Sequence, residues 1–497
     1  MPFNQLLHMK TSKPPVTSLD PVDWSDFRAQ SHRMLDDMID YVENIRDRPV
    51  WQPIPLESRR RFQTPLPAKP RSLASAHASF MTDVLPYAVG NVHPRFMGWV
   101  HGGGTPVGML AEMLAAGLNA NVGGRDQMPV EVEQQIVRWM RELFAFPETA
   151  SGLFVTGTSM ANFMGLLVAR AAVLSAAVRR DGVGEQGATL VAYCSLAAHG
   201  SISRAMDMSG LGTAALRQVP VNQRHQIDLA ALERSIAVDR AAGLRPFFVV
   251  GSAGTVDVGA VDDLVGLADI ATRESLWLHI DGAYAALGML APDIAPLLSG
   301  IEKADSLAFD FHKWGQVPYD AGFLLVRDGA QHQAAFASPA AYLQREARGL
   351  AAGAVWPCDL GPDLSRGFRA LKTWLTFTVF GTEQLGRSIS ETCRLARYMR
   401  DQIVLRQELE LLAPVALNIV CFRYRCGDAD NVNREIVADL HESGVAVPSM
   451  TTIDGKRAIR AALVNHRTCA QDIDALLTAV VAAGAARCTS PWTAENK

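Results

Sequence analysis

Short runs of apolar residues alternate with stretches of helical spacing through the middle of the chain. The runs end in polar or small residues, which is typical of buried strands, and the longer stretches carry apolar positions three and four residues apart. This alternation, from about residue 150 to 330, predicts a mostly parallel sheet covered by helices on both faces. The predicted strands lie at 152–155, 189–195, 247–250, 276–281 and 307–311, and the predicted helices at 106–118, 130–144 and 161–178.

The two ends of the chain follow other patterns. A helix with one charged face is predicted over 26–46, and six prolines between 49 and 70 predict an extended arm without regular structure, suited to wrapping another subunit. Beyond Asp328 the sequence predicts a mobile loop at 340–362, a long helix over 363–406, strands near 415–425 and 458–464, and helices near 431–443 and 471–486. We therefore expect an N-terminal helical and arm segment (1–105), a large domain (106–380) and a small α/β domain (381–497).

Composition narrows the class of protein. The chain has 497 residues, 48% hydrophobic and 20% charged, with a net charge of −4, so we expect a soluble globular protein without affinity for nucleic acid or an acidic membrane surface. No apolar run is long enough to span a membrane, and Met1–Lys10 lacks the apolar core of a signal peptide. The seven cysteines are scattered without the spacing of a metal site, which predicts reduced thiols, no bound metal and a cytoplasmic location.

A lysine and an aspartate stand at the ends of two predicted strands. Lys313 follows the strand at 307–311, and Asp281 ends the strand at 276–281, 32 residues earlier. Open α/β folds bind ligands at this edge of the sheet. A lone lysine at a strand end is most often solvated. Together, however, the two residues fit a pyridoxal phosphate site, in which the lysine holds the aldehyde as a Schiff base and the acid keeps the pyridine nitrogen protonated.

The best candidate for binding a phosphate is Thr156-Gly157-Thr158-Ser159, between a predicted strand and a predicted helix. Small hydroxyl residues at a helix start offer N–H and O–H donors to an anion, although an ordinary helix cap has the same composition. The glycines at 102–104 also precede a helix, and we interpret them as a tight turn. His199 fits either a buried structural histidine or a ring that lies flat on the cofactor.

Several short segments match a known family. They are His93-Pro94-Arg95-Phe96, Thr158-Ser159, Val191–Ser195 with Ala198-His199, Trp277–Tyr284, Ala304-Asp305-Ser306, His312-Lys313-Trp314, Ser365–Arg369 and Arg467-Thr468. On these segments the chain resembles the group II pyridoxal-phosphate decarboxylases, the family of aromatic-L-amino-acid decarboxylase and glutamate decarboxylase, from about residue 20 onwards. The resemblance implies an α/β protein of the PLP-dependent transferase type (fold type I), with a mostly parallel sheet in the large domain and a homodimer whose subunits share active sites.

The resemblance also implies a role for each matched residue. Lys313 would form the Schiff base, Asp281 would pair with the pyridine nitrogen, and His199 would stack on the ring and touch the substrate. The cofactor-binding set that it implies is Thr158, Ser159, His199, Thr255, Asp281, Ala283, Asp310, His312 and Lys313. The implied reaction is decarboxylation of an L-amino acid to the amine and CO2, with pyridoxal 5'-phosphate as cofactor.

Three positions depart from the family pattern. Gly254-Thr255-Val256 has one threonine where relatives often have two, and Asp310-Phe311 replaces Asn-Pro, so a carboxylate near the phosphate would need a hydrogen bond or solvent. The family's loop tyrosine, which protonates the carbanion, is replaced by Trp356-Pro357-Cys358, and Tyr342 lies well before it. The proton would then come from His199 or from the partner chain, or arrive slowly, and a slow step would let oxygen convert the carbanion into an aldehyde.

The substrate is constrained only through the residues that would line its pocket. The candidates are Trp99, His101, Gly102, Asn121, Arg125 and His199. Arg125 fits a distal carboxylate and an ordinary surface position equally well, so aromatic amino acids are only slightly favoured over acidic or polar ones. Three further hypotheses stay open: an aldehyde-forming decarboxylase, a fold-type-I enzyme of different reaction type such as a transaminase or carbon–sulfur lyase, and a cofactor-binding interaction protein.

Overall fold

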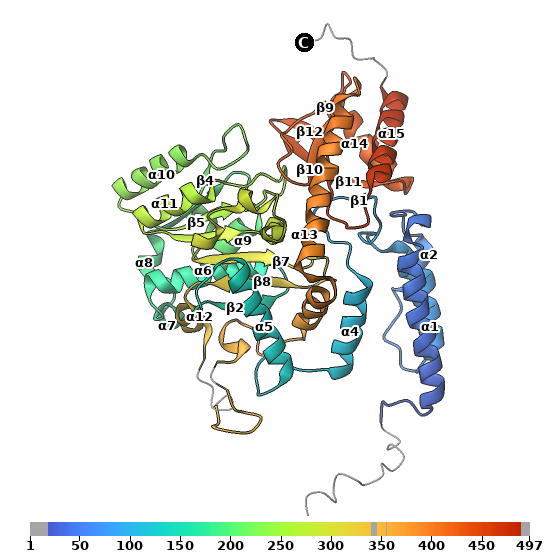
Figure 1. The fold of residues 1–497 in the computed structure, drawn as a ribbon, viewed down its shortest axis with the longest axis horizontal. Helices are drawn as coiled ribbons and strands as arrows, with labels where there is room; N and C mark the ends of the chain where they lie inside the picture. Colours follow the sequence, from blue (N-terminus) through green and yellow to red (C-terminus); the bar gives the residue numbers. More distant parts are fainter. Residues whose placement is uncertain (1–17, 339–344, 354, 489–497) are drawn as a thin grey trace, which may run out of the picture. The chain divides into compact units, whose positions relative to one another are not determined.

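The computed structural model of the chain describes residues 18–338, 345–353 and 355–488 (Figure 1). They form two compact units. The first is made of Met1–Arg48 and Gln52–Ala88, and the second of Pro49–Trp51 and Val89–Lys497, in each case as far as the chain is described. No helix within these described ranges is both long enough and apolar enough to cross a membrane.

The first unit is helical. Its longest helix, α1 (Trp24–Glu43), confirms the helix predicted in this region. Asp23 caps its start, because Oδ1 accepts hydrogen bonds from the backbone N–H groups of Ser25 (2.8 Å) and Asp26 (3.1 Å). The remaining elements are η2 (Ile45–Asp47), α2 (Leu56–Arg61), α3 (Leu73–Asp83) and η3 (Leu85–Tyr87).

The prediction that no regular structure forms between residues 49 and 70 is wrong at α2. This helix begins directly after Pro55 and ends before Pro65, so its six residues contain no proline. A proline just outside a helix start costs nothing, since the first N–H groups have no partner within the helix. Nη1 of Arg61 then donates a hydrogen bond to Asp83 Oδ1 (2.9 Å) at the end of α3. The prolines bracket a helix here and do not prevent one.

The second unit contains a seven-stranded sheet of order β2-β8-β7-β6-β5-β3-β4 (Figure 1). Every neighbouring pair is parallel except the two made by β8, which is antiparallel to β2 and to β7. The prediction of a mostly parallel sheet is therefore confirmed. The strands are β2 (Ser151–Val155), β3 (Leu190–Ser195), β4 (Leu216–Val219), β5 (Arg245–Ser252), β6 (Trp277–Asp281), β7 (Ser306–Asp310) and β8 (Gly322–Val326).

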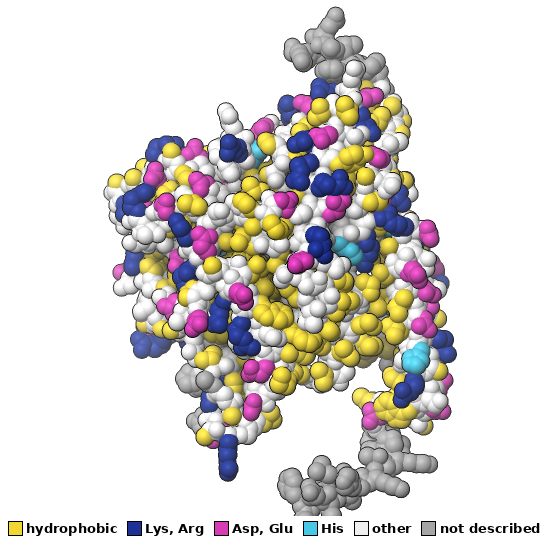
Figure 2. Space-filling view, in the orientation of Figure 1, with side chains coloured by type: hydrophobic (Ala, Val, Ile, Leu, Met, Phe, Trp, Pro, Cys, Tyr) yellow, Lys and Arg dark blue, Asp and Glu magenta, His cyan; other side chains and the backbone are white. Residues whose placement is uncertain are grey.

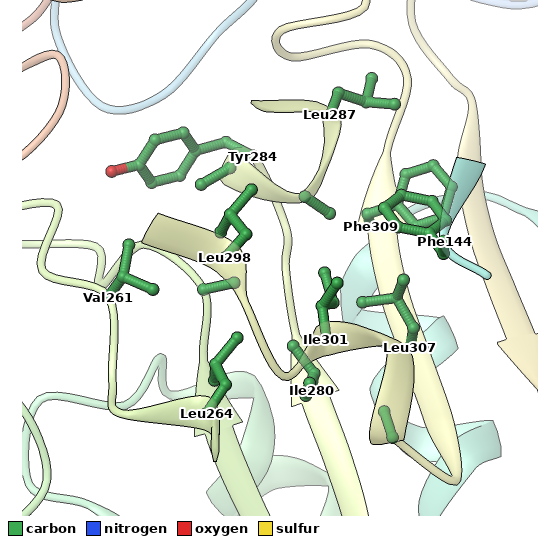
Figure 3. Packing of buried hydrophobic residues seen from close by; sticks show 14 of the residues in the cluster. Phe144, Val261, Leu264, Ile280, Tyr284, Leu287, Leu298, Ile301, Leu307 and Phe309 are labelled. Carbon is green, nitrogen blue, oxygen red and sulfur yellow. The ribbon is translucent and has the colours of Figure 1, made fainter. Parts of the chain in front are cut away.

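Both faces of this sheet are buried. In β7, Leu307 and Phe309 pack into the cluster that also holds Phe144 (Figure 3), whereas Ala308 points to the opposite face and packs with Met164 of helix α6 (Thr158–Leu174). All residues of β7 are buried. A strand covered on both sides has an almost continuous apolar sequence, which is the pattern observed at this position.

The helices of the second unit confirm those predicted, with shifts of a few residues at their ends. The most consequential shift is at α6, which begins at Thr158 and so includes the hydroxyl residues expected to precede it. The other helices are α4 (Pro106–Leu118), α5 (Met128–Leu143), α7 (Val178–Asp181), α8 (Gly184–Ala188), α9 (Ser201–Met208), α10 (Leu229–Ala241), α11 (Leu264–Glu274), α12 (Gly329–Phe336), α13 (Arg369–Val404), α14 (Ala429–Glu442) and α15 (Ala470–Arg487).

A second, five-stranded sheet of order β1-β11-β12-β10-β9 is formed mainly by the C-terminal part of the chain. Its strands are β1 (Phe96–Met97), β9 (Leu409–Leu411), β10 (Ile419–Tyr424), β11 (Val447–Ile453) and β12 (Lys456–Ala462). The sequence predicted β10 and β12 but neither β9 nor β11. Helix α13 continues across residue 380, with a kink at Gly381, whose φ of 67° favours glycine. The domain boundaries at 105 and 380 stay predictions.

Candidate active site

A cavity of about 530 Å³ lies at the carboxyl ends of β5, β6 and β7, whose last residues Ser252, Asp281 and Asp310 all line it. Parallel strands bring these ends to one edge of the sheet, which is where open α/β folds bind ligands. Most of the residues predicted for the site share this cavity. They are Trp99, His101, Thr158, Ser159, His199, Thr255, Asp281, Ala283, Asp310, His312 and Lys313.

Lys313 lies beside the carboxylate of Asp310. Its Nζ is 2.8 Å from Asp310 Oδ2, and Nε2 of His312 is 3.5 Å from the same oxygen. The second oxygen, Oδ1, accepts a hydrogen bond of 2.7 Å from the backbone N–H of Thr158. Asp310 therefore has the hydrogen bonds that a buried carboxylate needs at this position.

The imidazole of His312 is held in one protonation state. Burial lowers the pKa of His312 to about 4. Its Nδ1 accepts a hydrogen bond of 3.1 Å from the backbone N–H of Ala321, which leaves the proton of the neutral ring on Nε2. Nε2 thus presents a donor to the Asp310 side of the cavity.

Asp281 is buried and lines the cavity. Its Oδ2 accepts a hydrogen bond from Asn162 Nδ2 (2.9 Å), and its Oδ1 accepts one from the backbone N–H of Ala283 (3.1 Å). Burial raises the pKa of Asp281, and the hydrogen bond from Asn162 and the charges of Lys313 and His199 oppose that rise. Because burial destabilises the charged form of Asp281, a cationic N–H group bound next to it in the cavity would stabilise its carboxylate strongly.

Asn162 connects the two sides of the cavity, and no role for it was predicted from the sequence. Besides Asp281, its amide nitrogen donates to Ser201 Oγ (3.0 Å), and that hydroxyl lies 2.8 Å from Nδ1 of His199. Its amide oxygen lies 2.9 Å from Nε2 of His279. Asn162 follows Thr158 by one helical turn on α6, so the helix that starts at the cavity also positions the network behind it.

The start of α6 has the features of an anion site. Oγ1 of Thr158 is buried and has no hydrogen-bond partner within the described part of the chain. The backbone N–H groups at the start of this 17-residue helix add a positive partial charge. Thr255 is different, because its Oγ1 already accepts a hydrogen bond from the backbone N–H of Ala260 (3.0 Å), although its hydroxyl proton can still be donated to a ligand.

Aromatic rings form one wall of the cavity. The rings of Phe96, Trp99 and His101 contact one another, with centroid distances of 5.5 Å (His101 to Phe96), 6.0 Å (His101 to Trp99) and 6.1 Å (Phe96 to Trp99), and His101 meets Tyr319 in a T-shaped contact at 5.7 Å. The ring of Tyr319 also packs on His312 at 4.2 Å. Burial raises the pKa of Tyr319, so its phenol keeps its proton. Tyr319 was not among the predicted residues, although its place six residues after Lys313 was a usable signal.

Three of the predicted substrate residues do not line the cavity. Gly102 lies behind it, where a Cβ atom would come within 2.3 Å of the carbonyl oxygen of His312. Asn121 Oδ1 accepts hydrogen bonds from the backbone N–H groups of Gly123 and Arg366 (both 3.0 Å), and Arg125 packs on the ring of Trp356 at 4.5 Å. Within one chain, Asn121 and Arg125 are therefore occupied elsewhere.

The predicted mobile loop is described only in part. Tyr342 lies outside the described residues. Pro357 and Cys358 belong to the short helix η9 (Pro357–Asp359), where both are buried. Neither residue is a tyrosine, so the described part of this loop lacks the tyrosine that the family pattern has there.

Arg460 is a second cavity residue that was not predicted. It is 3% exposed, lines the cavity from β12, and donates hydrogen bonds to the carbonyl oxygens of Trp99 (3.0 Å) and Asp257 (3.1 Å). It makes no ion pair with any carboxylate of the described ranges. The sequence signal was an arginine inside the apolar run of β12.

These groups match the chemistry of pyridoxal phosphate. The molecule has an aldehyde for an amine such as Lys313, a basic ring nitrogen for a buried carboxyl such as Asp281, and a phosphate for the start of α6. The unpartnered Oγ1 of Thr158 and the raised pKa of Asp281 are two observations that a bound cofactor of this kind would account for. The residues present therefore fit the group that the resemblance implied.

The stability of the folded chain should depend on pH through His279, which is buried behind Asp281. Burial lowers its pKa to about 3. At a pH between about 6.5, the ordinary pKa of histidine, and about 3, His279 is protonated in the unfolded chain but not in the folded chain. The free energy of unfolding therefore falls as the pH falls, by about 1.4 kcal/mol per pH unit. Urea unfolding across this range measures the slope. His279→Gln should reduce the slope, whereas His32→Gln, at an exposed position, should leave it unchanged; equal slopes in all three proteins would contradict the prediction.

Comparison with known proteins gives consistent matches. The family model described as the pyridoxal-dependent decarboxylase conserved domain matches residues 55–425. An aromatic-L-amino-acid decarboxylase of Bacillus atrophaeus is 31% identical over 459 residues, which are 90% of this chain and 93% of the relative. A phenylacetaldehyde synthase of Petunia hybrida is 28% identical over 470 residues, with 90% and 92% covered.

Solved structures match over nearly the whole chain as well. The crystal structure of Oryza sativa TDC with PLP and tryptamine superposes with a TM-score of 0.86 at 24% identity, and the match covers 94% of this chain and 99% of that one. This confirms the predicted fold of type I, and the matches together confirm the expected cofactor, pyridoxal phosphate. Because the family model covers most of the chain and the bacterial relative aligns over nearly its full length, the chain belongs to the pyridoxal-dependent decarboxylase family.

Proposed function

We propose that this chain decarboxylates an aromatic L-amino acid to the amine and CO2 in the cavity around Lys313. Pyridoxal-phosphate-dependent decarboxylation follows from the family, while the aromatic substrate and the amine product are the proposal. The observation that carries it is the meeting of Lys313, Asp281 and a wall of aromatic rings in one cavity. The name of the Bacillus atrophaeus relative, an aromatic-L-amino-acid decarboxylase, supports the same substrate class.

Two residues would carry the chemistry of the cofactor. When bound, pyridoxal phosphate supplies a ring that accepts the electron pair left as CO2 departs. Lys313 would hold the aldehyde carbon covalently, since its Nζ lies in the cavity at the end of β7. Asp281 would keep the ring nitrogen protonated, because its buried carboxyl favours a cationic partner and Asn162 fixes its orientation.

The remaining predicted residues would hold the cofactor in place. Thr158 and Ser159 would donate hydrogen bonds to the phosphate at the start of α6, and His312 would donate from Nε2. Ala283 would lie against one ring face and His199 against the opposite one, oriented by Ser201. Thr255 and Asp310, the last two residues predicted to bind the cofactor, also line the cavity. Thr255 has a hydroxyl proton to donate, whereas the carboxylate of Asp310 contacts Lys313.

The substrate side chain would lie against Trp99, His101 and Tyr319. Stacking between aromatic rings favours such a substrate beyond the area it buries. Arg460 places a buried positive charge beside the cavity, and we propose that this charge attracts the substrate carboxylate. An acidic or polar amino acid is the alternative, and it would be recognised by Arg125 or Asn121 from a second subunit.

A second subunit is part of the proposal. Leu110, Met113, Leu114 and Leu118 of α4 are between 39% and 63% exposed, and Figure 2 shows hydrophobic side chains gathered over this region. A continuous apolar face of this kind is typical of an interface. We propose a homodimer with shared active sites, which would allow Asn121 and Arg125 to reach the partner's cavity. We also propose a cytoplasmic location, in keeping with the scattered spacing of the cysteines in the sequence.

The source of the final proton decides between an amine and an aldehyde. Tyr319 is a candidate donor in the cavity besides His199, since its phenol stays protonated and its ring packs against His312. The absence of a tyrosine at Pro357–Asp359 and the likeness to a phenylacetaldehyde synthase favour the aldehyde as the second candidate product. The two outcomes differ in whether oxygen is consumed.

A panel assay tests the proposal. The purified protein with pyridoxal phosphate is incubated with tyrosine, tryptophan, phenylalanine, glutamate and aspartate, while CO2, amine and dissolved oxygen are followed. We expect CO2 and the matching amine from an aromatic member without oxygen uptake. CO2 from an acidic member alone would overturn the aromatic assignment, and CO2 with oxygen uptake and an aldehyde would overturn the amine product.

A further inference from the structure

Asp310 contacts two groups that a bound cofactor would also contact. Its Oδ2 is 2.8 Å from Nζ of Lys313, the proposed attachment point, and its Oδ1 accepts the backbone N–H of Thr158 (2.7 Å), the first residue of α6. The proposed phosphate site thus already contains a negative charge of the chain itself. In the resemblance described above, many members of the family have an uncharged asparagine at this place, and this chain differs from them by a negative charge.

The carboxyl group of Asp310 is ionised in this arrangement. Burial alone would raise its pKa, but the charge of Lys313 and the hydrogen bonds from Lys313 and Thr158 outweigh burial and lower it. The side chain is 3% exposed, so solvent screens the pair with Lys313 only weakly. The contact between Asp310 Oδ2 and Lys313 Nζ is therefore a buried ion pair that has to separate before Nζ can bond to another group.

We propose that Asp310 is a positioning residue that holds Lys313 as an ion pair and stands in for the cofactor phosphate at the start of α6, so that the chain must give up these contacts when the cofactor enters. The inference rests on the proposed role of Lys313. It makes loading of the cofactor slower at neutral pH than it would be with an uncharged residue at position 310.

The covalent step would require this contact to separate. Nζ of Lys313 would bond to the aldehyde carbon as a neutral amine, after its ammonium group has given one proton to solvent, and the aldehyde oxygen would leave as water with the two remaining hydrogens of Nζ. The contact with Asp310 must be broken before this bond can form. The phosphate brings further negative charge to the neighbourhood of Asp310, and repulsion between like charges raises the dissociation constant of the cofactor.

The neighbouring titratable groups do not mimic this effect. His312 lies on the same turn and its pKa is lowered to about 4, while the pKa of Tyr319 is raised, so both stay neutral near pH 7. Burial and the charge of Lys313 lower the pKa of His101. Asp281 also interacts with Lys313 but is unchanged in the variants described next, so its contribution cancels in the comparison.

The test compares cofactor loading in the apo forms of the wild type, Asp310→Asn and Asp310→Ser. The association rate with pyridoxal phosphate is measured by visible absorbance between about pH 6 and pH 9, and the dissociation constants of pyridoxal phosphate and of inorganic phosphate are measured by calorimetry. Asp305→Asn, which removes a carboxylate just before the same strand, is the matched control. The serine variant gives a second measurement if the asparagine variant does not fold.

We expect both Asp310 variants to load pyridoxal phosphate about tenfold faster than the wild type at pH 7 and to bind inorganic phosphate more tightly. Asp305→Asn should behave as the wild type. A variant profile that coincides with the wild-type profile would overturn the role of Asp310 while leaving Lys313 as the attachment point. Failure of the wild type to bind pyridoxal phosphate at any pH would overturn the proposed function itself.

Discussion

Lys313→Ala is expected to lower the rate of CO2 release by about four orders of magnitude or more. Without the amine at the end of β7, no side chain is in place to hold the aldehyde carbon in the cavity. The cofactor would then be retained only by noncovalent contacts with the phosphate and the ring nitrogen. The measurement is CO2 release from the best member of the substrate panel, with visible absorbance recorded on the same sample.

Lys303→Ala is the matched control for this variant. Lys303 is an exposed lysine whose Nζ pairs with Asp269 at 3.4 Å, and neither residue lines the cavity. An exposed pair of this kind contributes little to stability, so the control should retain wild-type activity. Turnover by Lys313→Ala within tenfold of the wild type would rule out Lys313 as the attachment point.

Asp281→Asn is expected to lower the rate of CO2 release by about a thousandfold, which is on the order of 4 kcal/mol in the activation barrier. Asparagine keeps the size of the side chain but not the negative charge that holds the ring nitrogen in its protonated form. An unprotonated ring is a much weaker acceptor for the electron pair released with CO2. The hydrogen bond with Asn162 also loses its charged acceptor.

This variant should still bind the cofactor, since Lys313 and the start of α6 are unchanged. Visible absorbance therefore distinguishes a lost cofactor from a lost electron acceptor. Asp305→Asn again serves as a control for removing one partly buried carboxylate from the same sheet region. If Asp281→Asn retained full cofactor and lost less than tenfold in rate, the proposed pairing of Asp281 with the ring nitrogen would be wrong.

The fold and the two central residues could be predicted from the sequence because both depend on local patterns. Apolar runs with polar ends located β6 and β7, and parallel strands necessarily bring Asp281 and Lys313 to one edge. The start of α6 was misplaced by three residues, since hydroxyl residues are compatible with either a cap or a first turn. Helix α2 was missed because the prolines around it dominated the pattern.

The rest of the site depends on contacts between segments far apart in the sequence. Asn162 matters because it meets Asp281 and Ser201, and Arg460 because β12 of the second sheet brings it to the cavity. Neither contact can be predicted from the spacing of apolar residues along the chain. Asn121 and Arg125 were predicted to lie near the substrate; within one chain they instead contact the backbone N–H of Arg366 and the ring of Trp356, so their proposed role depends on a second subunit.

The attachment of the cofactor to Lys313 is the central claim, and chemical reduction tests it most directly. The protein loaded with pyridoxal phosphate is treated with borohydride, digested and mapped by mass spectrometry. We predict a phosphopyridoxyl group on the peptide that contains Lys313 and on no other lysine. A label on a different lysine, such as Lys372, or no label on a protein that has bound the cofactor would contradict this attachment.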